Sequence, residues 1–286
     1  MKKNPFFVSS KIENPDFLLL MKEKKVNSIP IISNSKVIGI KGLQGEVNTE
    51  YENPVLLMAG GYGQRLRPLT EDCPKPMLKV GQKPMMEILL NRFKKSGFKN
   101  FYISTLYKSE VIEEHFGNGE NFGVSIKYLN EPEPLGTGGA LGLIPKECKN
   151  FPMIICNADI LTKVNFEDLL KFHKKNKAAA TIGIRRYQFE IPYGVVQGNE
   201  ETLISIEEKP LKTYFVNAGI YVLNESVVRS VKKNQRVDLP DLLKQEITNK
   251  NKALVFPIHE YWLDIGRLED FKKAQIDINT ISFNEL

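Results

Sequence analysis

The feature that most constrains the fold is an alternation of apolar runs and helix-period segments, which starts at Pro54. The run PVLLMA is apolar at nearly every position, as expected of a strand that is covered on both faces. Helix-period MMEILLNRFKK, strand-like NFYIST, helix-period KSEVIEEHF and strand-like VSIKYL follow, and PMIICNAD comes later. This alternation predicts an α/β domain with a mostly parallel sheet that has helices on both faces.

The pattern changes after residue 178. The segments AATIGIRR, YGVVQ, LISIEEK and FVNAGIYVL read as strands with short connections, which predicts a mixed or antiparallel extension of the sheet. We expect helices over GGALGLI, NESVVRSVKK, LPDLLKQEITNK and RLEDFKKAQIDIN, and one more strand over ALVFPI. The domain is therefore expected to span residues 54–286.

Residues 1–43 look like a separate unit. We expect a helix from Pro15 to Lys25, followed by strands over Ser28–Ile32 and Lys36–Ile40 with a turn at residues 33–35. Residues 44–53 are polar and rich in turn-forming types, which predicts a linker.

Composition narrows the class of protein. The net charge of +6 suits a polyanionic small molecule or a nucleic acid. The lysines are scattered without interleaved aromatic residues, so we expect solvated helix faces and no nucleic-acid partner. Cys73, Cys148 and Cys156 lack metal-ligand spacing, and no segment is apolar enough for a membrane span. We therefore expect a cytoplasmic protein without disulfides or membrane contact.

The stretch VLLMAGGYGQRLRPLT leaves an apolar strand through Gly60, Gly61 and Gly63, and Arg65 follows at once. Glycines let backbone N–H groups approach a ligand closely, and a guanidinium beside them favours phosphate. The alternative is an ordinary strand-to-helix turn. A Walker loop fits poorly because no Gly-Lys-Ser/Thr follows, and a dinucleotide fingerprint fits poorly because Leu66 replaces the third glycine.

Four more punctuated stretches fall at predicted strand ends, where open α/β sheets bind ligands. CPKPML holds Lys75 between two prolines, and NEPEPLGTGGA offers a second glycine-rich turn. Asp159 ends ICNAD and Asp264 lies in YWLDIGR. These carboxylates suit Mg²⁺, which takes one or two carboxylates together with phosphate oxygens. Each feature also has a structural explanation. Lys75 could be a surface lysine, the glycine-rich segment a tight turn, and Asp159 and Asp264 helix N-caps.

The segments PYGVV, SIEEKP and FVNAGIY offer hydroxyl-binding groups and one cation. The residues of interest are Tyr193, Gly194, Glu208, Lys209 and Asn217. A simple hairpin explains these segments equally well.

Together and in their order along the chain, these segments resemble the motifs of the sugar-1-phosphate nucleotidyltransferases. The matching segments are AGGYGQRLRPLT, PKPML, PLGTGGAL, NAD, YGVV, EEKP, VNAGIY and WLDIG. The resemblance covers residues 54 to about 280. It implies a Rossmann-like fold, a nucleoside triphosphate and a sugar 1-phosphate as substrates, and Mg²⁺-assisted in-line attack at the α-phosphorus.

The resemblance also implies roles for individual residues. Arg65 and Lys75 would bind phosphates, Asp159 and Asp264 would hold Mg²⁺, and Lys209 would contact the sugar phosphate. The implied nucleotide site comprises Ala59, Gly60, Gly61, Gly63, Glu131, Gly136 and Thr137, and the implied sugar pocket comprises Tyr193, Gly194, Glu208 and Asn217. The chain departs from the family at Gln64, where Thr or Ser is usual.

Glu131 stands where thymidylyltransferases of this family carry the glutamine that reads the base. A carboxylate only accepts hydrogen bonds. It therefore suits the adjacent N1–H and N2–H₂ donors of guanine, whereas thymine would place carbonyl oxygens against it. This predicts GTP as the nucleotide, with Glu133 as the alternative reading residue.

Residues 1–43 resemble the latter part of a cystathionine-β-synthase-type (CBS) motif, which often binds adenine nucleotides. A CBS-like segment ahead of such a transferase resembles the arrangement in enzymes that act on glucosamine-1-phosphate for the legionaminic acid route of flagellin glycosylation. The alternatives are a mannose-1-phosphate guanylyltransferase, a glucose-1-phosphate thymidylyl- or uridylyltransferase, and a non-catalytic nucleotide-sugar sensor. A homo-oligomer is expected.

Overall fold

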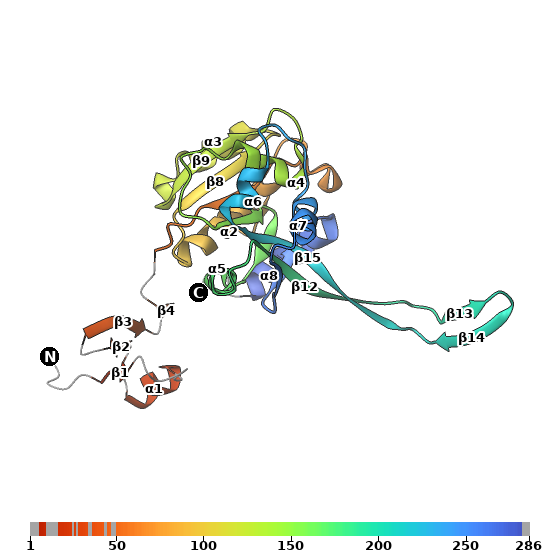
Figure 1. Ribbon diagram of the computed structural model, residues 1–286, viewed down its shortest axis with the longest axis horizontal. Coiled ribbons are helices and arrows are strands. Elements are labelled where there is room, and N and C mark those ends of the chain that lie inside the picture. Colours follow the sequence, from red (N-terminus) through yellow and green to blue (C-terminus); the bar gives the residue numbers. More distant parts are fainter. Residues whose placement is uncertain are drawn as a thin grey trace.

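The computed structural model describes residues 6–9, 17–24, 26, 28–33, 36–42, 45–46 and 50–281. A seven-stranded sheet with flanking helices forms the body of the molecule (Figure 1). In spatial order, its strands are β16 (Ala253–Pro257), β12 (Ala180–Glu190), β15 (Leu211–Leu223), β10 (Met153–Asn157), β5 (Val55–Met58), β8 (Asn100–Thr105) and β9 (Ser125–Asn130).

The sheet is mixed and mostly parallel. Strands β10, β5, β8 and β9 run parallel to one another, and β16 runs parallel to β12. Only β15 runs against both of its neighbours. The predicted α/β fold class is therefore confirmed, including the antiparallel component after residue 178.

Alternate side chains of the central strands enter two cores on opposite faces of the sheet. Val55 and Leu57 pack in one core, and Leu56 between them packs in the other. The longer helices are α2 (Met85–Lys95), α3 (Ser109–Phe116), α5 (Phe166–Lys175), α7 (Leu239–Thr248) and α8 (Leu268–Thr280), and α6 is Glu225–Ser230. Helices α2, α3 and α5 contribute to the first core, while α6 and α7 contribute to the second. This covering of both faces explains why β5 is apolar throughout.

The helix expected over GGALGLI is wrong in detail. The structure has a short α4 (Gly136–Gly139) and then a 3₁₀ turn, Ala140–Leu143. A Cβ atom on Gly139 would lie 2.7 Å from the Gln235 carbonyl oxygen, and one on Gly142 would lie 2.2 Å from that of Lys232. These glycines permit close backbone packing, and glycine is a poor helix former, so the helix stays short.

Strands β12 and β15 are longer than the expected strands and form a ribbon. They pair antiparallel from Ile184 opposite Asn217 to Glu190 opposite Leu211, beyond a bulge near Gly183. The hairpin β13 (Val195–Asn199) and β14 (Thr202–Glu207) follows at the tip. Figure 1 shows this ribbon projecting far from the body.

The amino-terminal unit agrees with the expected pattern where the structure describes it. It contains α1 (Phe17–Lys24) and the strands β1 (Val8–Ser9), β2 (Ser28–Ser33), β3 (Lys36–Gly42) and β4 (Gly45–Glu46). β2 and β3 pair antiparallel, and Val8, Met21 and Ile29 pack together. Pro15, Lys25 and turn residues 34–35 lie outside the described residues. The CBS relationship stays a prediction.

The end of the expected linker packs against the body. The Tyr51 ring stacks on Phe98 with centroids 4.9 Å apart. The buried Asn53 amide donates hydrogen bonds to the carbonyl oxygens of Asn150, at 2.7 Å, and Pro152, at 2.8 Å. Residues 50–53 thus belong with the body, which begins before Pro54.

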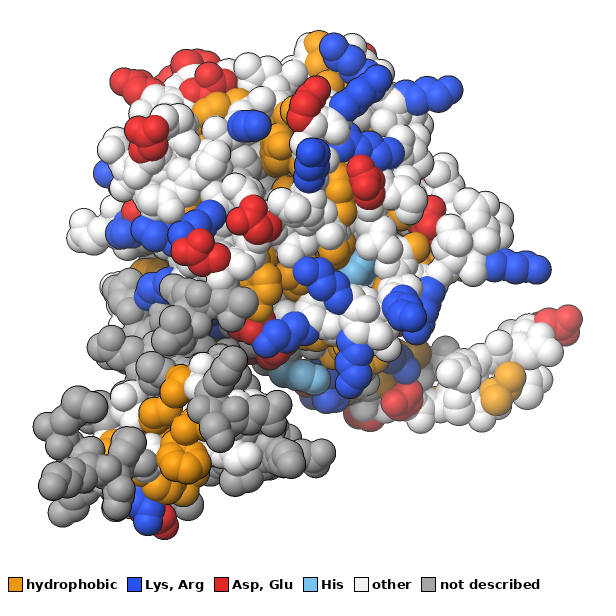
Figure 2. Space-filling model, turned by 60° about the vertical axis from the view of Figure 1, so that its left-hand side comes forward, with side chains coloured by type: hydrophobic (Ala, Val, Ile, Leu, Met, Phe, Trp, Pro, Cys, Tyr) orange, Lys and Arg blue, Asp and Glu red, His pale blue; other side chains and the backbone are white. Residues whose placement is uncertain are grey.

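The charged side chains are dispersed. Figure 2 shows lysines and arginines spread over one face among acidic groups, as the scattered lysines of the sequence predict. Among the described residues, no helix is long and apolar enough to cross a membrane.

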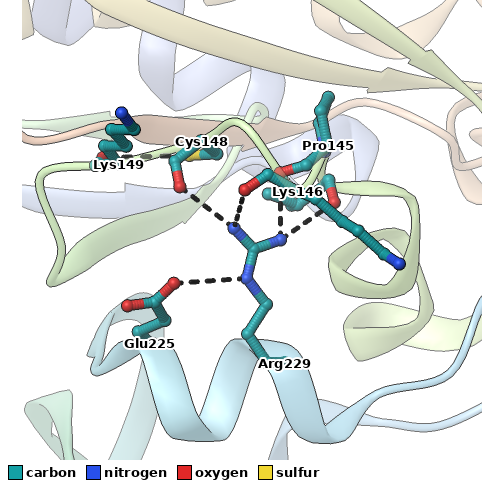
Figure 3. A network of polar contacts seen from close by, with 7 residues as sticks. Pro145, Lys146, Cys148, Lys149, Glu225 and Arg229 are labelled. Carbon is teal, nitrogen blue, oxygen red and sulfur yellow. Dashed lines mark hydrogen bonds and ion pairs between the residues drawn. The ribbon is translucent and has the colours of Figure 1, made fainter.

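Arg229 holds the loop that leads into β10 (Figure 3). Its guanidinium donates to the carbonyl oxygens of Ile144, Pro145, Lys146 and Cys148 at 2.9–3.2 Å. Glu225, one turn earlier on α6, lies 3.5 Å from the Arg229 Nε atom. A planar fork with five donors can meet four carbonyl groups at once, whereas an ammonium group cannot.

We expect Arg229→Lys to lower the free energy of unfolding by about 2 kcal/mol, because partly buried carbonyl groups would lose their donors. Denaturation in guanidinium chloride measures the change. Arg236→Lys is the matched control, since Arg236 is exposed on the same part of the chain, and it should leave stability within about 0.5 kcal/mol. Equal stability of the two variants would contradict the role of the network.

Candidate active site

The glycine-rich loop begins where β5 ends. A Cβ atom on Gly60 would lie 2.8 Å from the Glu131 Oε1 atom, so glycine permits the close approach of that carboxyl group. Gly63 has a φ of 64°, and a Cβ atom there would lie 3.1 Å from that of Lys75. Among the described residues other than its two chain neighbours, no atom lies within 4 Å of the position of a Cβ on Gly61. The loop is thus packed at Gly60 and Gly63 and open at Gly61.

Lys75 lies at the start of a 3₁₀ turn, Lys75–Met77, with Pro74 before it and Pro76 after it. Although charged, it is only 9% exposed. Its ammonium group forms an ion pair with Asp159 Oδ2. Asp159 follows β10, and its Oδ1 atom is buried without a hydrogen-bond partner among the described residues. The carboxylate therefore retains an acceptor for a further cation or donor.

A two-stranded pairing places Asp264 near Asp159 and Lys75. It ends β17 (Trp262–Asp264), which runs antiparallel to β11 (Ile160–Thr162), with Asp264 opposite Ile160. The Ile265 N–H group donates to the Asp159 carbonyl oxygen at 3.2 Å. Partial burial and the negative charge of Asp159 raise the pKa of Asp264, against the opposing effects of Lys75 and Arg65.

Arg65 completes this group of charges. A Cβ atom on Gly266 would lie 3.7 Å from the Arg65 Nη1 atom, which places the guanidinium beside the turn after Asp264. We call Arg65, Lys75, Asp159 and Asp264 the charged centre. Motifs distant in the sequence thus meet at the carboxyl ends of β5 and β10.

The charged centre fits a magnesium ion that shares its coordination with a substrate. Asp159 has an unpartnered buried oxygen, and Asp264 is a second carboxylate beside it. Among the described residues, no group of three or more His, Cys, Asp or Glu side chains could hold a metal. Two carboxylates are sufficient for Mg²⁺ when phosphate oxygens and water supply the remaining ligands.

Glu131 lies just beyond β9, beside the glycine-rich loop. Its Oε2 atom accepts a hydrogen bond from the Leu135 N–H group at 3.3 Å. Burial raises the pKa of Glu131, and this hydrogen bond opposes the rise. The side chain therefore stands between the two glycine-rich segments, where a ligand on the loop could contact it.

Thr137 forms hydrogen bonds with the start of α7, and Gly136 packs closely against the residue before it. The Thr137 N–H and hydroxyl groups lie 2.8 and 3.1 Å from Asp238 Oδ1, and the Leu239 N–H group donates to the Thr137 hydroxyl at 2.9 Å. A Cβ atom on Gly136 would lie 2.7 Å from the Val237 carbonyl oxygen. In this structure the Thr137 hydroxyl thus joins the glycine-rich turn to α7.

Residues 54–280 match the family model described as Nucleotidyl transferase. The chain belongs to the nucleotidyl transferase family. Its match covers most of the body described above, including every residue of the charged centre.

Relatives of this nucleotidyl transferase include two named guanylyltransferases. The chain is 31% identical over 230 residues to the mannose-1-phosphate guanylyltransferase of Mycobacterium tuberculosis, covering 78% of this chain and 64% of that protein. It is 34% identical over 218 residues to the D-glycero-alpha-D-manno-heptose 1-phosphate guanylyltransferase of Campylobacter jejuni, covering 76% and 96%. The chain thus spans less than two thirds of the mycobacterial relative and nearly all of the Campylobacter one.

The fold also agrees with a solved structure. HddC from Yersinia pseudotuberculosis superposes with a TM-score of 0.61 at 24% identity, covering 79% of this chain and 99% of that one. The same protein has been solved in complex with GMP-PN. At this identity the likeness establishes the fold.

The predicted sugar-pocket residues divide into two places. Asn217 lies at the base of the ribbon, where its Oδ1 atom accepts from the Gly219 N–H group at 2.9 Å. Tyr193, Gly194 and Glu208 lie near the tip, with the Glu208 Oε2 atom 3.0 Å from the position of a Cβ on Gly194. Lys209 follows there with a φ of 44°.

The structure does not bring the tip residues to the charged centre of their own chain. The paired strands β12 and β15 carry the tip away from the body (Figure 1). The assignment of Tyr193, Gly194, Glu208 and Lys209 to the sugar site stays a prediction, and in this structure the ribbon tip lies away from the charged centre of its own chain. The reason is the length of the β12–β15 pairing, which the short strand-like segments of the sequence did not reveal.

Sequence reasoning also missed two supporting residues. Thr70 donates from its hydroxyl to the Gly63 carbonyl oxygen at 2.9 Å and holds the glycine-rich loop. Asp238 binds Thr137 as described above. Asp238 directly precedes the helix-period segment LPDLLKQEITNK, as an N-cap residue would, and that position was the available signal.

We expect Lys75→Ala to reduce turnover by at least about a hundredfold, because it removes a buried positive charge from the charged centre. Lys75→Arg should restore only part of the loss, since a planar fork replaces a compact ammonium group. Pyrophosphate release under saturating substrates, the activity proposed below, measures both effects. Lys79→Ala, at an exposed position on the same segment, is the control. Wild-type turnover in Lys75→Ala would exclude Lys75 from the reaction.

Proposed function

We propose that this chain transfers a guanylyl group from GTP to a sugar 1-phosphate and releases pyrophosphate. The charged centre beside an open glycine-rich loop is the observation that carries this proposal. Both substrates are polyanions, so their approach requires positive charge at the reacting phosphates. Arg65 and Lys75 supply that charge on segments held by packing and hydrogen bonds.

In the proposed reaction, a phosphate oxygen of the sugar attacks the α-phosphorus while the bond to pyrophosphate breaks. Lys75 exchanges its ion pair with Asp159 for an interaction with phosphate oxygens of the nucleotide. Arg65 neutralises charge on the triphosphate, and no side-chain nucleophile is needed. Magnesium held by Asp159 and Asp264 would supply further positive charge at the phosphate oxygens when bound. The main contributions of the protein are alignment and electrostatic stabilisation.

The choice of GTP rests on Glu131. Its carboxylate lies beside Gly60 and can accept from both N1–H and N2–H₂ of guanine. Thymine and uracil would present carbonyl oxygens on either side of one N–H group. The guanylyltransferase names of the relatives support the same choice.

We expect the wild-type protein to favour GTP over dTTP by at least about tenfold in kcat/KM. Glu131→Gln should reduce the preference, because an amide can donate to a carbonyl oxygen as well as accept. Glu133→Gln is the matched control two positions along the same loop. The test is the ratio of GTP to dTTP turnover in all three proteins. A wild-type preference for dTTP would contradict the guanine assignment, and an effect confined to Glu133→Gln would transfer the role to that residue.

Three sugar 1-phosphates are candidates for the acceptor substrate. The resemblance of residues 1–43 to a CBS segment favours glucosamine-1-phosphate and the legionaminic acid route, with an adenine nucleotide as a possible ligand of that unit. The names of the relatives favour mannose-1-phosphate or a manno-heptose 1-phosphate. We propose glucosamine-1-phosphate, with mannose-1-phosphate as the alternative that the names of the relatives support.

A panel experiment tests the activity and the sugar together. Four nucleoside triphosphates are combined with glucosamine-, mannose-, glucose- and manno-heptose 1-phosphates, and pyrophosphate release is measured with Mg²⁺. We expect GTP with one of these sugars to support turnover, and Asp264→Asn to reduce it by at least about a hundredfold. Activity retained in Asp264→Asn would remove that residue from the site. No activity with any pair would favour the nucleotide-sugar sensor.

A further inference from the structure

The hydroxyl group of Ser104 is a buried polar group that the fold alone does not explain. Ser104 lies in β8 and is 1% exposed. Its Oγ atom forms no well-oriented hydrogen bond among the described residues. A buried hydroxyl group without a partner destabilises a fold, and the large majority of such groups are paired. An alanine at this position would avoid the penalty, so the hydroxyl group requires another explanation.

The register of the sheet places Ser104 on the same side as Glu131. Ser104 lies opposite Leu129 in the β8–β9 pairing, and the Glu131 N–H group donates to the Thr105 carbonyl oxygen at 2.9 Å. Alternate residues of a strand share a face. Tyr102 and Leu129 pack in the same core, which identifies that face of the sheet. Ser104, two positions after Tyr102, and Glu131, two positions after Leu129, therefore follow each other along it.

The Glu131 carboxyl group lies between the glycine-rich loop, β8 and the segment before α4. A Cβ atom on Gly60 would lie 2.8 Å from Glu131 Oε1 and 3.7 Å from the Leu106 Cβ atom. Burial raises the pKa of Glu131, while the Leu135 N–H group and the Ser104 hydroxyl group lower it. No charged side chain of the part of the chain that the structure describes is among these influences. Burial thus favours the neutral acid, and two uncharged donors favour the carboxylate.

The two charge states of Glu131 suit different bases. A carboxylate accepts from both N1–H and N2–H₂ of guanine. A protonated carboxyl group has one donor and one acceptor, as the amide of glutamine does. It would donate to a carbonyl oxygen of thymine or uracil and accept from the N3–H group, whereas it would place its own donor against a donor of guanine. The protonation state of one side chain therefore decides which base the site prefers.

We propose that Ser104 is the positioning residue that keeps Glu131 ionised for the recognition of guanine. Its hydroxyl group donates to the carboxylate from β8, and the Leu135 N–H group donates from the segment before α4. The other lone pairs of the carboxylate stay available to the base. This inference rests on the proposed use of GTP. Without the hydroxyl group, the buried carboxyl group returns toward its neutral form, and the preference for guanine is lost in mildly acidic solution.

The ratio of kcat/KM for GTP to kcat/KM for dTTP, followed from about pH 5 to about pH 8, tests the proposal. Protonation of the triphosphate or of the charged centre affects both nucleotides and cancels in this ratio. We expect the ratio to fall toward acid pH as Glu131 takes up a proton. Ser104→Ala should move this fall about one pH unit higher, the effect of losing one hydrogen bond to a charged group. Ser104→Thr retains the hydroxyl group and should keep the wild-type pH profile. A ratio that stays constant in Ser104→Ala, or that falls at the same pH as in the wild type, would overturn the proposal.

A double-mutant cycle separates this role from a general structural one. The amide in Glu131→Gln does not ionise in this pH range, so the ratio should be independent of pH in that variant. Adding Ser104→Ala to Glu131→Gln should leave the ratio independent of pH, because the carboxyl group on which Ser104 acts is gone. If the double variant instead shows the pH-dependent fall of Ser104→Ala, Ser104 acts through another group and the proposal is wrong.

Calorimetric titration with GTP and with dTTP gives the corresponding binding ratio without turnover. At about pH 8 we expect Ser104→Ala to bind GTP as the wild type does, which also shows that the variant is folded. If no sugar 1-phosphate supports turnover, the transferase proposal fails, and the pH dependence of the binding ratio still decides the role of Ser104. A wild type that binds dTTP more tightly than GTP at this pH would contradict the guanine assignment and overturn the role of Ser104 with it.

Discussion

The charged centre depends on one interaction, the ion pair between Lys75 and Asp159. The charge of Asp159 acts on Asp264, and two neighbouring negative charges raise the free energy of the folded chain unless a cation lies between or beside them. Lys75 supplies that cation from a turn in which two prolines restrict the backbone. A ligand that brings its own magnesium would relieve the same repulsion. The ion pair thus offsets the repulsion between the carboxylates, while the Asp159 Oδ1 atom keeps no hydrogen-bond partner among the described residues.

The surrounding strands fix the positions of these charged groups relative to one another. β11 and β17 pair so that Asp264 lies opposite Ile160, one residue after Asp159. Trp262 in β17 donates from its indole N–H group to the Ala218 carbonyl oxygen at 2.9 Å, which fastens the pairing to β15. Because β15 also borders β10, it is tied both to β10, which precedes Asp159, and to β17, which ends at Asp264. The positions of both carboxylates therefore depend on β15.

Much of this arrangement could be predicted from residue patterns. The apolar runs of β5 and β10 and the position of Asp159 at a strand end identified the sheet and the edge at which ligands bind. The short form of α4 could not be predicted in the same way, because it depends on the backbone near Lys232 and Gln235 approaching Gly142 and Gly139. The length of the β12–β15 ribbon could not be predicted for a related reason. Residues such as Tyr187 and Phe215 favour a strand but do not indicate whether it lies on a core or projects into solvent.

The proposed division of the site between body and ribbon has a physical consequence for specificity. Side chains at the charged centre lie against buried strands, so Asp159 and Lys75 are constrained by the packing of the core as well as by chemistry. The described residues of the ribbon tip belong to no such core, and Tyr193 and Glu208 lie in bends between the β12–β15 pairing and the β13–β14 hairpin. In the proposed site, substitutions at the tip would alter contacts with the sugar without disturbing the sheet. In such an arrangement the phosphate chemistry is held by the most stable part of the fold, while sugar selection resides where the folding free energy constrains the sequence least.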